Sequence, residues 1–207
     1  MYVPHEFSVN DLNEIAVFLQ YHSFGIIVST QGNFEPIATH LPFVIKKSGD
    51  QFLLEGHMSK HNQQAEILKK GKKVMVIFQG PHAYVSSSVY SHVNVPTWNY
   101  QAVHIYGTID LLDEKEAENH LKELVEMHEA DREHSFDLST LSPEMLTAYQ
   151  NEIICFKIES YRVEAAFKLS QNRNFVDYER IIEDLSTDKK NRSITEAMNR
   201  SRKSDQA

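Results

Sequence analysis

The apolar and polar positions of the chain follow a helical spacing near the N-terminus and an alternating, strand-like pattern through the middle. Apolar residues recur at helical spacing over residues 9–21, which predicts an amphipathic helix there. Ser8 and Asp11, three residues apart, resemble a capping box at its start.

Short β-rich runs separated by turn residues follow this helix. The predicted strands cover residues 24–30, 34–47, 51–58, 73–78, 82–88, 98–112 and 153–167. In the second run, Pro36 and Pro42 are expected at edges or bulges, and Gln79-Gly80-Pro81 is expected to break the fourth. Runs at such short intervals favour a sandwich or barrel over alternating βαβ units.

Helix-start signals appear at four later places. Ser59 is expected to cap a short helix over residues 60–70, and Asp113 with Glu116 to cap a longer one. Ser142-Pro143 is expected to open another, because proline suits the first helical position. The polar C-terminal segment is predicted to be partly helical, with Ser193 and Glu196 as a further capping box. The chain is therefore predicted to be a single α+β domain with a mostly antiparallel β-barrel in its middle third.

Composition adds that the protein is globular. Its 207 residues are 41% hydrophobic and 24% charged, enough for one substantial core. No apolar run approaches the roughly 20 residues that cross a bilayer, and no signal peptide is apparent at the N-terminus. Cys155, the single cysteine, excludes an internal disulfide and is expected to be a buried structural thiol. We therefore expect a cytoplasmic protein with no membrane association.

The formal net charge of −8 argues against broad binding to nucleic acid, because such binding works by neutralising phosphates. Any DNA contact would need a local basic patch, and one candidate lies near the C-terminus around Glu196. Its members are Lys189, Lys190, Arg192, Arg200, Arg202 and Lys203. The alternative is a solvated terminal helix and tail.

The candidate chemistry lies in polar and aromatic clusters at strand ends and turns. Ser59 and Lys60 would stand at a helix N-terminus, where free N–H groups and the helix dipole favour a phosphate. Alternatively, Ser59 is only a cap and Lys60 only a surface charge. His57 and His61 would not share a helical face, so no metal site is predicted. Motifs of hydrolases, kinases and dinucleotide-binding proteins are absent, and no catalytic residue is predicted.

Two further segments have a functional and a structural interpretation. Trp98, the single tryptophan, could pack in a core or interface, or could form a wall beside a flat ring system. Residues 167–173 combine donors that suit an anion or polar edge, but could equally form a capped turn.

Taken together, these segments resemble the PaiB-type transcriptional regulators, a family within the FMN-binding split-barrel superfamily. The matching words are Thr39-His40-Leu41-Pro42-Phe43, Gly56-His57, Phe78-Gln79-Gly80-Pro81-His82-Ala83-Tyr84, Pro96-Thr97-Trp98-Asn99-Tyr100, Val103-His104, Tyr106-Gly107 and Phe167-Lys168-Leu169-Ser170-Gln171-Asn172-Arg173. Their order and spacing cover the chain from Tyr2 to about Arg173. The resemblance implies a six-stranded split barrel over residues 1–175, with a helical extension over residues 176–207. It also implies a homodimer with two flavin-sized sites across the subunit interface.

The resemblance also implies positions for the FMN. Ser59, Lys60 and Asn62 would hold its phosphate. Thr39, His40 and Leu41 would face the ring, Phe78 and Gln79 would lie beside the ring or ribityl chain, and Trp98 and Asn99 would close the site from the other subunit. His57, Lys168, Gln171 and Arg173 complete the candidate set. Two departures stand out: Ala166 replaces an expected lysine, and Lys60 is the only cation near the phosphate position.

Three functions follow as hypotheses. The first is a homodimeric, FMN-binding negative regulator of degradative-enzyme and sporulation genes, with direct DNA contact through the basic C-terminal region as an option. The second is a flavin-dependent oxidoreductase, in which the cofactor would carry the chemistry. The third is a haem-binding split barrel with a histidine as axial ligand.

Overall fold

The computed structural model describes residues 1–204, with the side chains of residues 203 and 204 outside the description. The chain divides into two compact units. Unit 1 contains Met1–Phe18, Gln79–His104 and the chain from Glu164 onward, and unit 2 contains Leu19–Phe78 and Ile105–Val163. Phe78 and Gln79, neighbours in the sequence, thus belong to different units.

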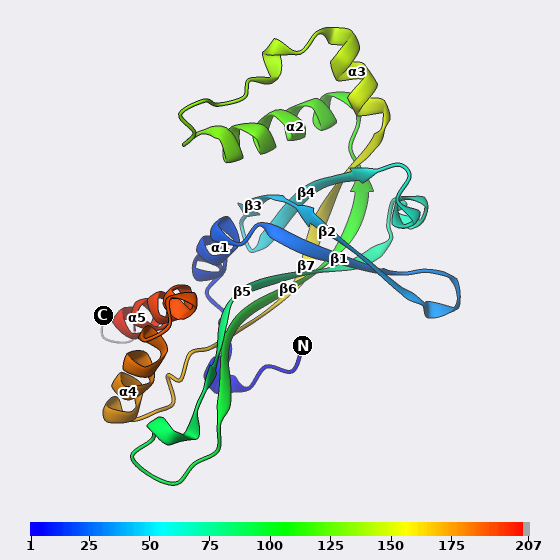
Figure 1. Cartoon of the computed structure of the whole chain (residues 1–207). Coiled ribbons are helices and arrows are strands. Elements are labelled where there is room, and N and C mark those ends of the chain that lie inside the picture. Colours follow the sequence, from blue (N-terminus) through cyan, green and yellow to red (C-terminus); the bar gives the residue numbers. More distant parts are fainter. Residues whose placement is uncertain (205–207) are drawn as a thin grey trace. The chain divides into compact units, whose positions relative to one another are not determined.

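A seven-stranded sheet has the order β2-β1-β5-β6-β7-β4-β3 (Figure 1). The strands are β1 (Phe24–Thr30), β2 (Pro36–Pro42), β3 (Val44–Ser48), β4 (Gln51–Ser59), β5 (Lys73–Val85), β6 (Thr97–Leu111) and β7 (Ile153–Lys168). The pairs β1–β2, β1–β5, β3–β4 and β4–β7 are antiparallel. The predicted α+β class with an antiparallel sheet is therefore confirmed.

The sheet has seven strands where the resemblance implied six, and the predicted run over residues 34–47 forms two of them. β2 pairs with β1, whereas β3 pairs with β4. Between them, the Phe43 side chain is fully buried and its N–H donates to the carbonyl of Ser23 at 3.0 Å. Pro42 has no N–H for a sheet ladder, so the chain changes partner at this point.

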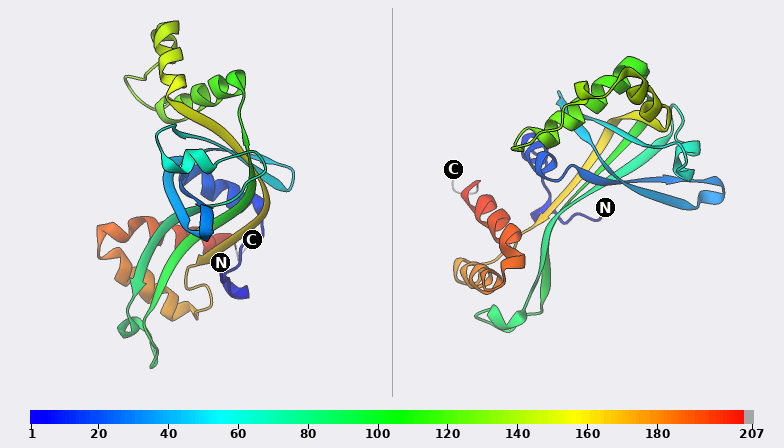
Figure 2. Two further views of the ribbon diagram at one scale, coloured as in Figure 1. Left: turned by 90° about the vertical axis from the view of Figure 1, so that its right-hand side faces the viewer. Right: turned by 45° about the horizontal axis from the view of Figure 1, so that its top comes forward.

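The expected break at Gln79-Gly80-Pro81 is also wrong, because β5 runs through it to Val85. Buried positions fall on even-numbered residues up to Phe78 and on odd-numbered residues from Ala83 onward. One extra residue is therefore accommodated between them, as in a β-bulge, where glycine and proline are tolerated inside a strand. Figure 2 shows β5 and its neighbour β6 running side by side as long strands.

The core of unit 2 is built from phenylalanine rings. Phe43 packs edge-on against Phe78 and Phe156, with ring centroids 5.7 and 6.4 Å apart. A Cβ on Gly25 would lie 2.6 Å from the Phe78 ring, and one on Gly56 would lie 3.1 Å from Phe43. Both glycines thus leave room that the aromatic core occupies.

Two α-helices of unit 2 begin where the sequence predicts. In α2 (Glu114–Glu129), the Asp113 side chain accepts from the Glu116 N–H at 2.8 Å, and the Glu116 side chain accepts from the Asp113 N–H at 3.0 Å. In α3 (Pro143–Asn151), the Ser142 hydroxyl accepts from the N–H of Met145. Both predicted helix starts are confirmed.

The prediction of a helix over residues 60–70 is wrong. The segment contains only a five-residue 3-10 helix, η3 (Gln63–Ile67), whose N-cap is Asn62. Ser59 is the last residue of β4, where it pairs with Ile153 of β7. Strand pairing therefore extends through the position where the sequence suggests a cap.

Helix α1 (Leu12–Tyr21) confirms the helix predicted over residues 9–21, and the boundary between the units falls within it. Its cap differs from the prediction. Asp11 accepts from the N–H of Asn13 at 2.8 Å, while Ser8 forms an isolated β-bridge with Ala166. The Ser8–Asp11 capping box is therefore wrong.

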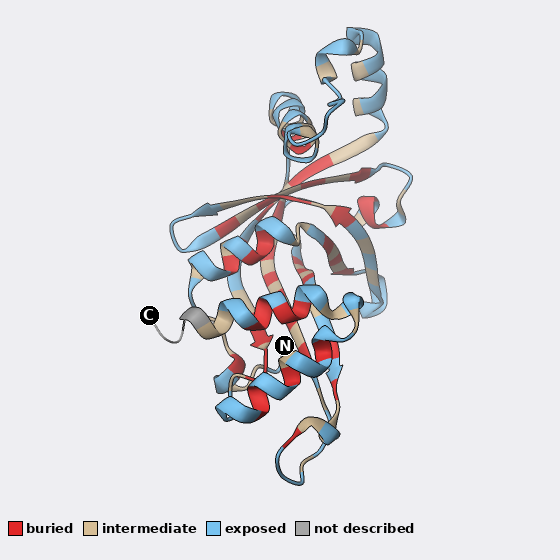
Figure 3. Ribbon diagram, turned by 60° about the vertical axis from the view of Figure 1, so that its left-hand side comes forward, coloured by how far each residue is buried: buried red, intermediate tan, exposed pale blue. Residues whose placement is uncertain are grey.

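Unit 1 also contains α4 (Phe175–Ser186) and α5 (Arg192–Ser204), which confirm the expected helical C-terminal segment. Figure 3 shows buried residues along one face of each helix. They include Tyr178, Ile181 and Leu185 of α4, and Ile194, Ala197 and Met198 of α5. Ser193 lies inside α5, so the predicted box with Glu196 is wrong.

Candidate functional site

The β4–η3 loop, residues 59–62, is the segment of unit 2 expected to hold a phosphate. Its backbone is fixed by the start of β7: the Lys60 N–H donates to the Glu152 carbonyl at 2.9 Å. The Ser59 hydroxyl oxygen accepts from the N–H of His61 at 3.1 Å. The His61 Nε2 lies 3.2 Å from a Glu152 carboxylate oxygen on the exposed surface.

Asn62 joins this loop to β2. Its side-chain oxygen accepts from the Gln64 N–H at 2.9 Å, and its Nδ2 donates to the Thr39 hydroxyl oxygen at 3.0 Å. Thr39 and Asn62, both predicted site residues, are thus brought together. The dipole argument for a phosphate fails, however, because η3 has only five residues and Asn62 already satisfies its first turn.

Three donors of this region remain available to a ligand. The Ser59 and Thr39 hydroxyl oxygens each accept a hydrogen bond, and each hydroxyl keeps its own proton to donate. Within residues 1–204, the Lys60 ammonium forms no ion pair. We call Thr39, Ser59 and Lys60 the open donor set. Two hydroxyls and one ammonium are a suitable complement for a phosphate.

His57, two residues before Ser59, is turned toward helix α2. Its Nδ1 lies 3.1 Å from the Nε2 of His120, and the two rings meet edge-on with centroids 5.4 Å apart. Burial lowers the pKa of both histidines, that of His120 to about 4, with the charges of His57 and Lys46 adding to the effect. We call His57 and His120 the histidine pair; it is neutral at physiological pH.

His120 escapes prediction from the sequence, although its position offers a signal. It lies three residues after Ala117 and four before Leu124, on the apolar stripe of α2, and it is fully buried. Its Nδ1 has no hydrogen-bond partner, and a Glu55 carboxylate oxygen lies 3.9 Å away. The sequence pattern places His120 on the buried face of α2, but only the structure shows that it contacts His57.

Cys155 pairs in register with His57 and is buried, as expected for a structural thiol. Burial raises the pKa of the thiol to about 11, against a smaller opposing effect of the Lys60 charge. A thiol that stays protonated at neutral pH is a poor nucleophile. Among residues 1–204, no group of histidine, cysteine or acidic side chains has the arrangement of a metal site.

The residues expected beside the flavin ring differ in whether their side chains are exposed or buried. His40 is exposed and stacks on Phe24, with ring centroids 6.1 Å apart. Leu41 is buried, and Phe78 is fully buried in the phenylalanine core. Only His40 of these three therefore offers a side chain to a ligand in this structure.

Unit 1 carries an exposed aromatic cluster, which consists of His82 and Tyr84 of β5 and Trp98 of β6. The Trp98 indole N–H donates to the His82 Nδ1 at 3.2 Å. The Trp98 centroid lies 5.7 Å from that of His82 and 6.0 Å from that of Tyr84. Trp98 is 48% exposed and Tyr84 is 52% exposed, so the tryptophan is not a core residue of this chain. Gln79, also in unit 1, is exposed.

Asn99, next to Trp98, is fully buried and its side chain is satisfied inside unit 1. Its oxygen accepts from the Ser170 hydroxyl at 3.0 Å, and its amide nitrogen lies 3.5 Å from the Met198 sulfur. Asn99 therefore holds α5 and the 167–173 segment in place and presents no free group.

The 167–173 segment is the capped turn that the sequence allows. The Gln171 side chain bonds the Phe167 carbonyl and the Leu169 N–H, at 2.6 and 2.7 Å. The Lys168 ammonium donates to the Thr97 hydroxyl, and the Arg173 guanidinium lies 4.9 Å from the Tyr90 ring centroid. The Gln171 amide is thus used within unit 1, and Lys168 and Arg173 each contact a neighbouring residue there.

The basic C-terminal region is partly neutralised. Lys190 pairs with Asp188 at 2.8 Å, Arg192 pairs with Glu196 at 2.9 Å, and Arg202 pairs with Glu179. Lys189 and Arg200 have no ion-pair partner among residues 1–204, and the side chain of Lys203 lies outside the described residues. Within the same residues, no helix is long and apolar enough to span a bilayer.

Comparison with known proteins places these features in a family. Residues 1–162 match the family described as "Putative FMN-binding domain". The chain is 44% identical over 188 residues to the protease synthase and sporulation protein PAI 2 of Bacillus subtilis, covering 91% of this chain and 90% of that protein.

Solved structures share the fold at low sequence identity. The FAD and haem binding protein of Mycobacterium smegmatis is 12% identical with a TM-score of 0.59, covering 78% of this chain and 73% of that one. The conserved hypothetical protein Rv2991 of Mycobacterium tuberculosis is also 12% identical with a TM-score of 0.59, covering 84% of this chain and 94% of that one. With the match over residues 1–162 and the identity to PAI 2, the chain belongs to the PaiB-type family of FMN-binding-domain proteins.

Proposed function

We propose that this protein is a PaiB-like negative regulator of transcription, acting on genes for degradative enzymes and sporulation, which binds FMN at a homodimer interface. The name of its Bacillus subtilis relative refers to protease synthesis and sporulation, and the description of the family refers to FMN. The observation that carries the flavin part is the open donor set of Thr39, Ser59 and Lys60, whose protons have no acceptor within the described chain.

The FMN phosphate would be held by the Lys60 ammonium and the two hydroxyls of the open donor set. Asn62 would orient Thr39, because its amide fixes the hydroxyl oxygen and leaves the proton to donate. His40 follows Thr39 directly in β2, so its exposed side chain points to the opposite face of the sheet and would reach the ring only across the edge that β2 forms. When bound, FMN would supply a ring that can be reduced and reoxidised.

The aromatic cluster supports a role for a second copy of the chain. A tryptophan that is 48% exposed beside a tyrosine that is 52% exposed leaves a large apolar surface in water. We propose that Trp98 of the partner subunit covers the flavin ring. Asn99 is not included, since both of its side-chain groups are used inside unit 1.

The flavin and the dimer are tested together by recording an absorption spectrum and the mass in solution of the purified protein, before and after FMN is added. The proposal expects a dimer that binds FMN and quenches its fluorescence. Bleaching of the bound flavin by NAD(P)H would favour the oxidoreductase, and a Soret band would favour haem. A monomer that leaves FMN fluorescence unchanged would overturn the flavin site.

Direct DNA contact would use Lys189 and Arg200, the members of the basic patch whose described side chains have no ion-pair partner. Removing the segment is a poor test, because Ile194, Ala197 and Met198 of α5 are buried in unit 1. The sharper variant is Lys189→Glu with Arg200→Glu, which reverses charge on the surface. Lys47→Glu with Lys115→Glu is the matched control, since both residues are exposed and lie in unit 2.

The measurement is a band-shift assay with the DNA upstream of the regulated genes. Loss of the shift in the C-terminal variant alone supports direct contact through this segment. An equal loss in both variants would indicate nonspecific electrostatics and contradict it.

A further inference from the structure

A groove lies between α2 and the segment that leads into α3, all within unit 2. Its volume is about 740 Å³, which is inside the range of roughly 300 to 1,000 Å³ usual for small-molecule sites. The apolar lining comprises Leu121, Val125, Ala130, Phe136, Leu138 and Leu146. The groove is therefore large enough for a small ligand.

This apolar lining is separate from the surface that anchors α2. His120 and Leu124 are the buried residues of the helix, whereas Leu121 and Val125 are only partly buried. Phe136, which also lines the groove, is 45% exposed. The apolar atoms of the groove thus remain open to an occupant.

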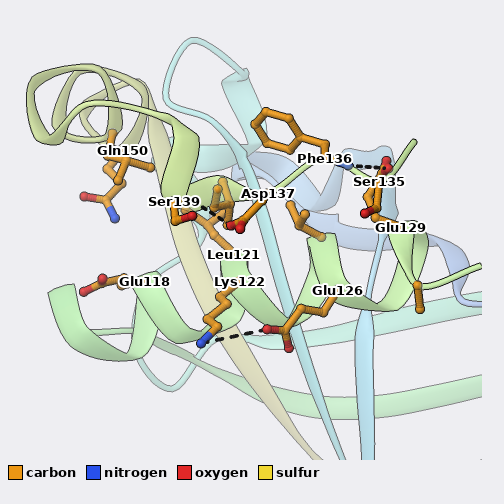
Figure 4. A pocket seen from close by; sticks show the side chains of 14 residues that line it. Glu118, Leu121, Lys122, Glu126, Glu129, Ser135, Phe136, Asp137, Ser139 and Gln150 are labelled. Atoms are coloured by element: carbon orange, nitrogen blue, oxygen red, sulfur yellow. Dashed lines mark hydrogen bonds and ion pairs between the residues drawn. The ribbon is translucent and has the colours of Figure 1, made fainter. Parts of the chain in front are cut away.

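The polar lining of the groove is acidic. The lining includes one cation, Lys122, and the acidic residues Glu118, Glu126, Glu129 and Asp137 (Figure 4). The Lys122 ammonium lies 3.8 Å from Glu126, and Glu129 accepts from the Phe136 N–H and pairs with Arg132. Two carboxylates, those of Glu118 and Asp137, form no ion pair among residues 1–204, although the Lys122 charge contributes to lowering the pKa of Asp137.

Asp137 remains ionised, because hydrogen bonds from the Ser139 backbone and side chain lower the pKa of its carboxyl. Its negative charge is therefore present at pH 7. The groove combines an apolar lining with two carboxylates that form no ion pair among residues 1–204, those of Glu118 and Asp137. This combination favours a molecule with an apolar body and a positive charge.

We propose that this groove is a ligand site for a small amphipathic cation, an organic amine with an alkyl or aryl body. The apolar body would lie on Leu121, Val125 and Phe136, and the ammonium would lie near Glu118 and Asp137. The inference does not depend on flavin binding or on DNA binding.

The test uses three probes of equal length and different charge, which are octylamine, 1-octanol and octanoate. Binding to the full-length protein is measured by calorimetry at pH 7. We expect octylamine to bind about tenfold more tightly than octanol, since one charge-assisted contact contributes about that much. Octanoate is expected to bind more weakly than octanol.

Two variants locate the site. Glu118→Gln is expected to bring octylamine binding toward that of octanol, while Glu114→Gln, on the exposed first turn of the same helix and outside the groove, leaves both unchanged. Val125→Lys is expected to abolish octylamine binding, and circular dichroism checks that each variant keeps its helices.

Equal binding of all three probes, or octylamine binding that survives Val125→Lys, would overturn the proposal. So would a dimer that dissociates in the Val125→Lys variant, because the groove would then be covered by a second copy of the chain.

Discussion

His57 of the histidine pair and Ser59 of the open donor set lie two residues apart on β4, yet only the polar groups of the histidine pair are bonded to each other within the protein. His57 and His120 bond each other under α2, and both lose charge through burial. Ser59 ends the same strand and Lys60 follows it, and neither the Ser59 hydroxyl proton nor the Lys60 ammonium has an acceptor in the described chain. Polar groups that satisfy each other stabilise the fold, and those left over can bind a ligand.

The largest effect on stability is expected when the histidine pair is disrupted. His120→Ala removes a fully buried ring and leaves the His57 nitrogen without its partner. We expect the free energy of unfolding to fall by about 2 to 4 kcal/mol in urea denaturation. His61→Ala, which removes an exposed imidazole, is the control and should change it by less than about 0.5 kcal/mol. A similar loss in both variants would contradict the account.

The histidine pair also predicts how stability depends on pH. The pKa of His120 is about 4 in the folded protein and about 6.5 in the unfolded chain, so only the unfolded chain binds the proton between these values. The free energy of unfolding should therefore fall from pH 6.5 to pH 4, by at most about 3 kcal/mol from this group. Urea denaturation of the protein and of His120→Phe at several pH values measures it. If the free energy of unfolding of His120→Phe falls with pH as steeply as that of the unmodified protein, His120 is not the group responsible.

In the open donor set, the variant Lys60→Ala is expected to weaken FMN binding and to leave the free energy of unfolding almost unchanged. Removing an unpaired ammonium costs the fold little, but a charge-assisted bond to phosphate contributes about 1.5 to 3 kcal/mol. FMN binding, followed by quenching of its fluorescence, should weaken about tenfold or more. Lys69→Ala is the matched control. Unchanged affinity in the Lys60 variant would remove this residue from the site.

A smaller effect is expected for Ser59→Ala, which deletes one neutral hydroxyl donor. The donor is uncharged but the phosphate acceptor is ionised, so the bond is expected to contribute about 1.5 kcal/mol, the lower end of the range for hydrogen bonds to charged groups, and FMN affinity should fall by no more than about tenfold. Riboflavin, which lacks the phosphate, is the control ligand and should bind both proteins equally. A parallel loss for riboflavin would show that the loop has changed shape and that no phosphate contact was removed.

What could be predicted from the sequence depends on how local the cause is. The Asp113–Glu116 capping box and the Ser142-Pro143 start were predictable because a helix cap is satisfied within four residues. The Ser59 cap was not, since pairing with Ile153 continues the strand through it. The same holds for Gly80-Pro81, where a strand neighbour keeps β5 continuous.

The candidate site shows the same limit. The resemblance pointed to Thr39 and Asn62, and the structure joins them with a hydrogen bond. It also pointed to Asn99, whose groups are used by contacts with residues distant in sequence, and to Gln171, which bonds both its own turn and the distant Glu6 carbonyl. His120 was missed because its partner lies 63 residues away. Which polar groups remain free is a property of tertiary packing.

The central claim, that the open donor set holds a phosphate, is tested most directly by titrating the unmodified protein with FMN and with riboflavin under the same conditions. The two ligands share their ring and ribityl chain and differ only in the phosphate. The account predicts that FMN binds about tenfold or more tightly than riboflavin, and that the difference shrinks as salt rises. Equal affinities for the two ligands would contradict it.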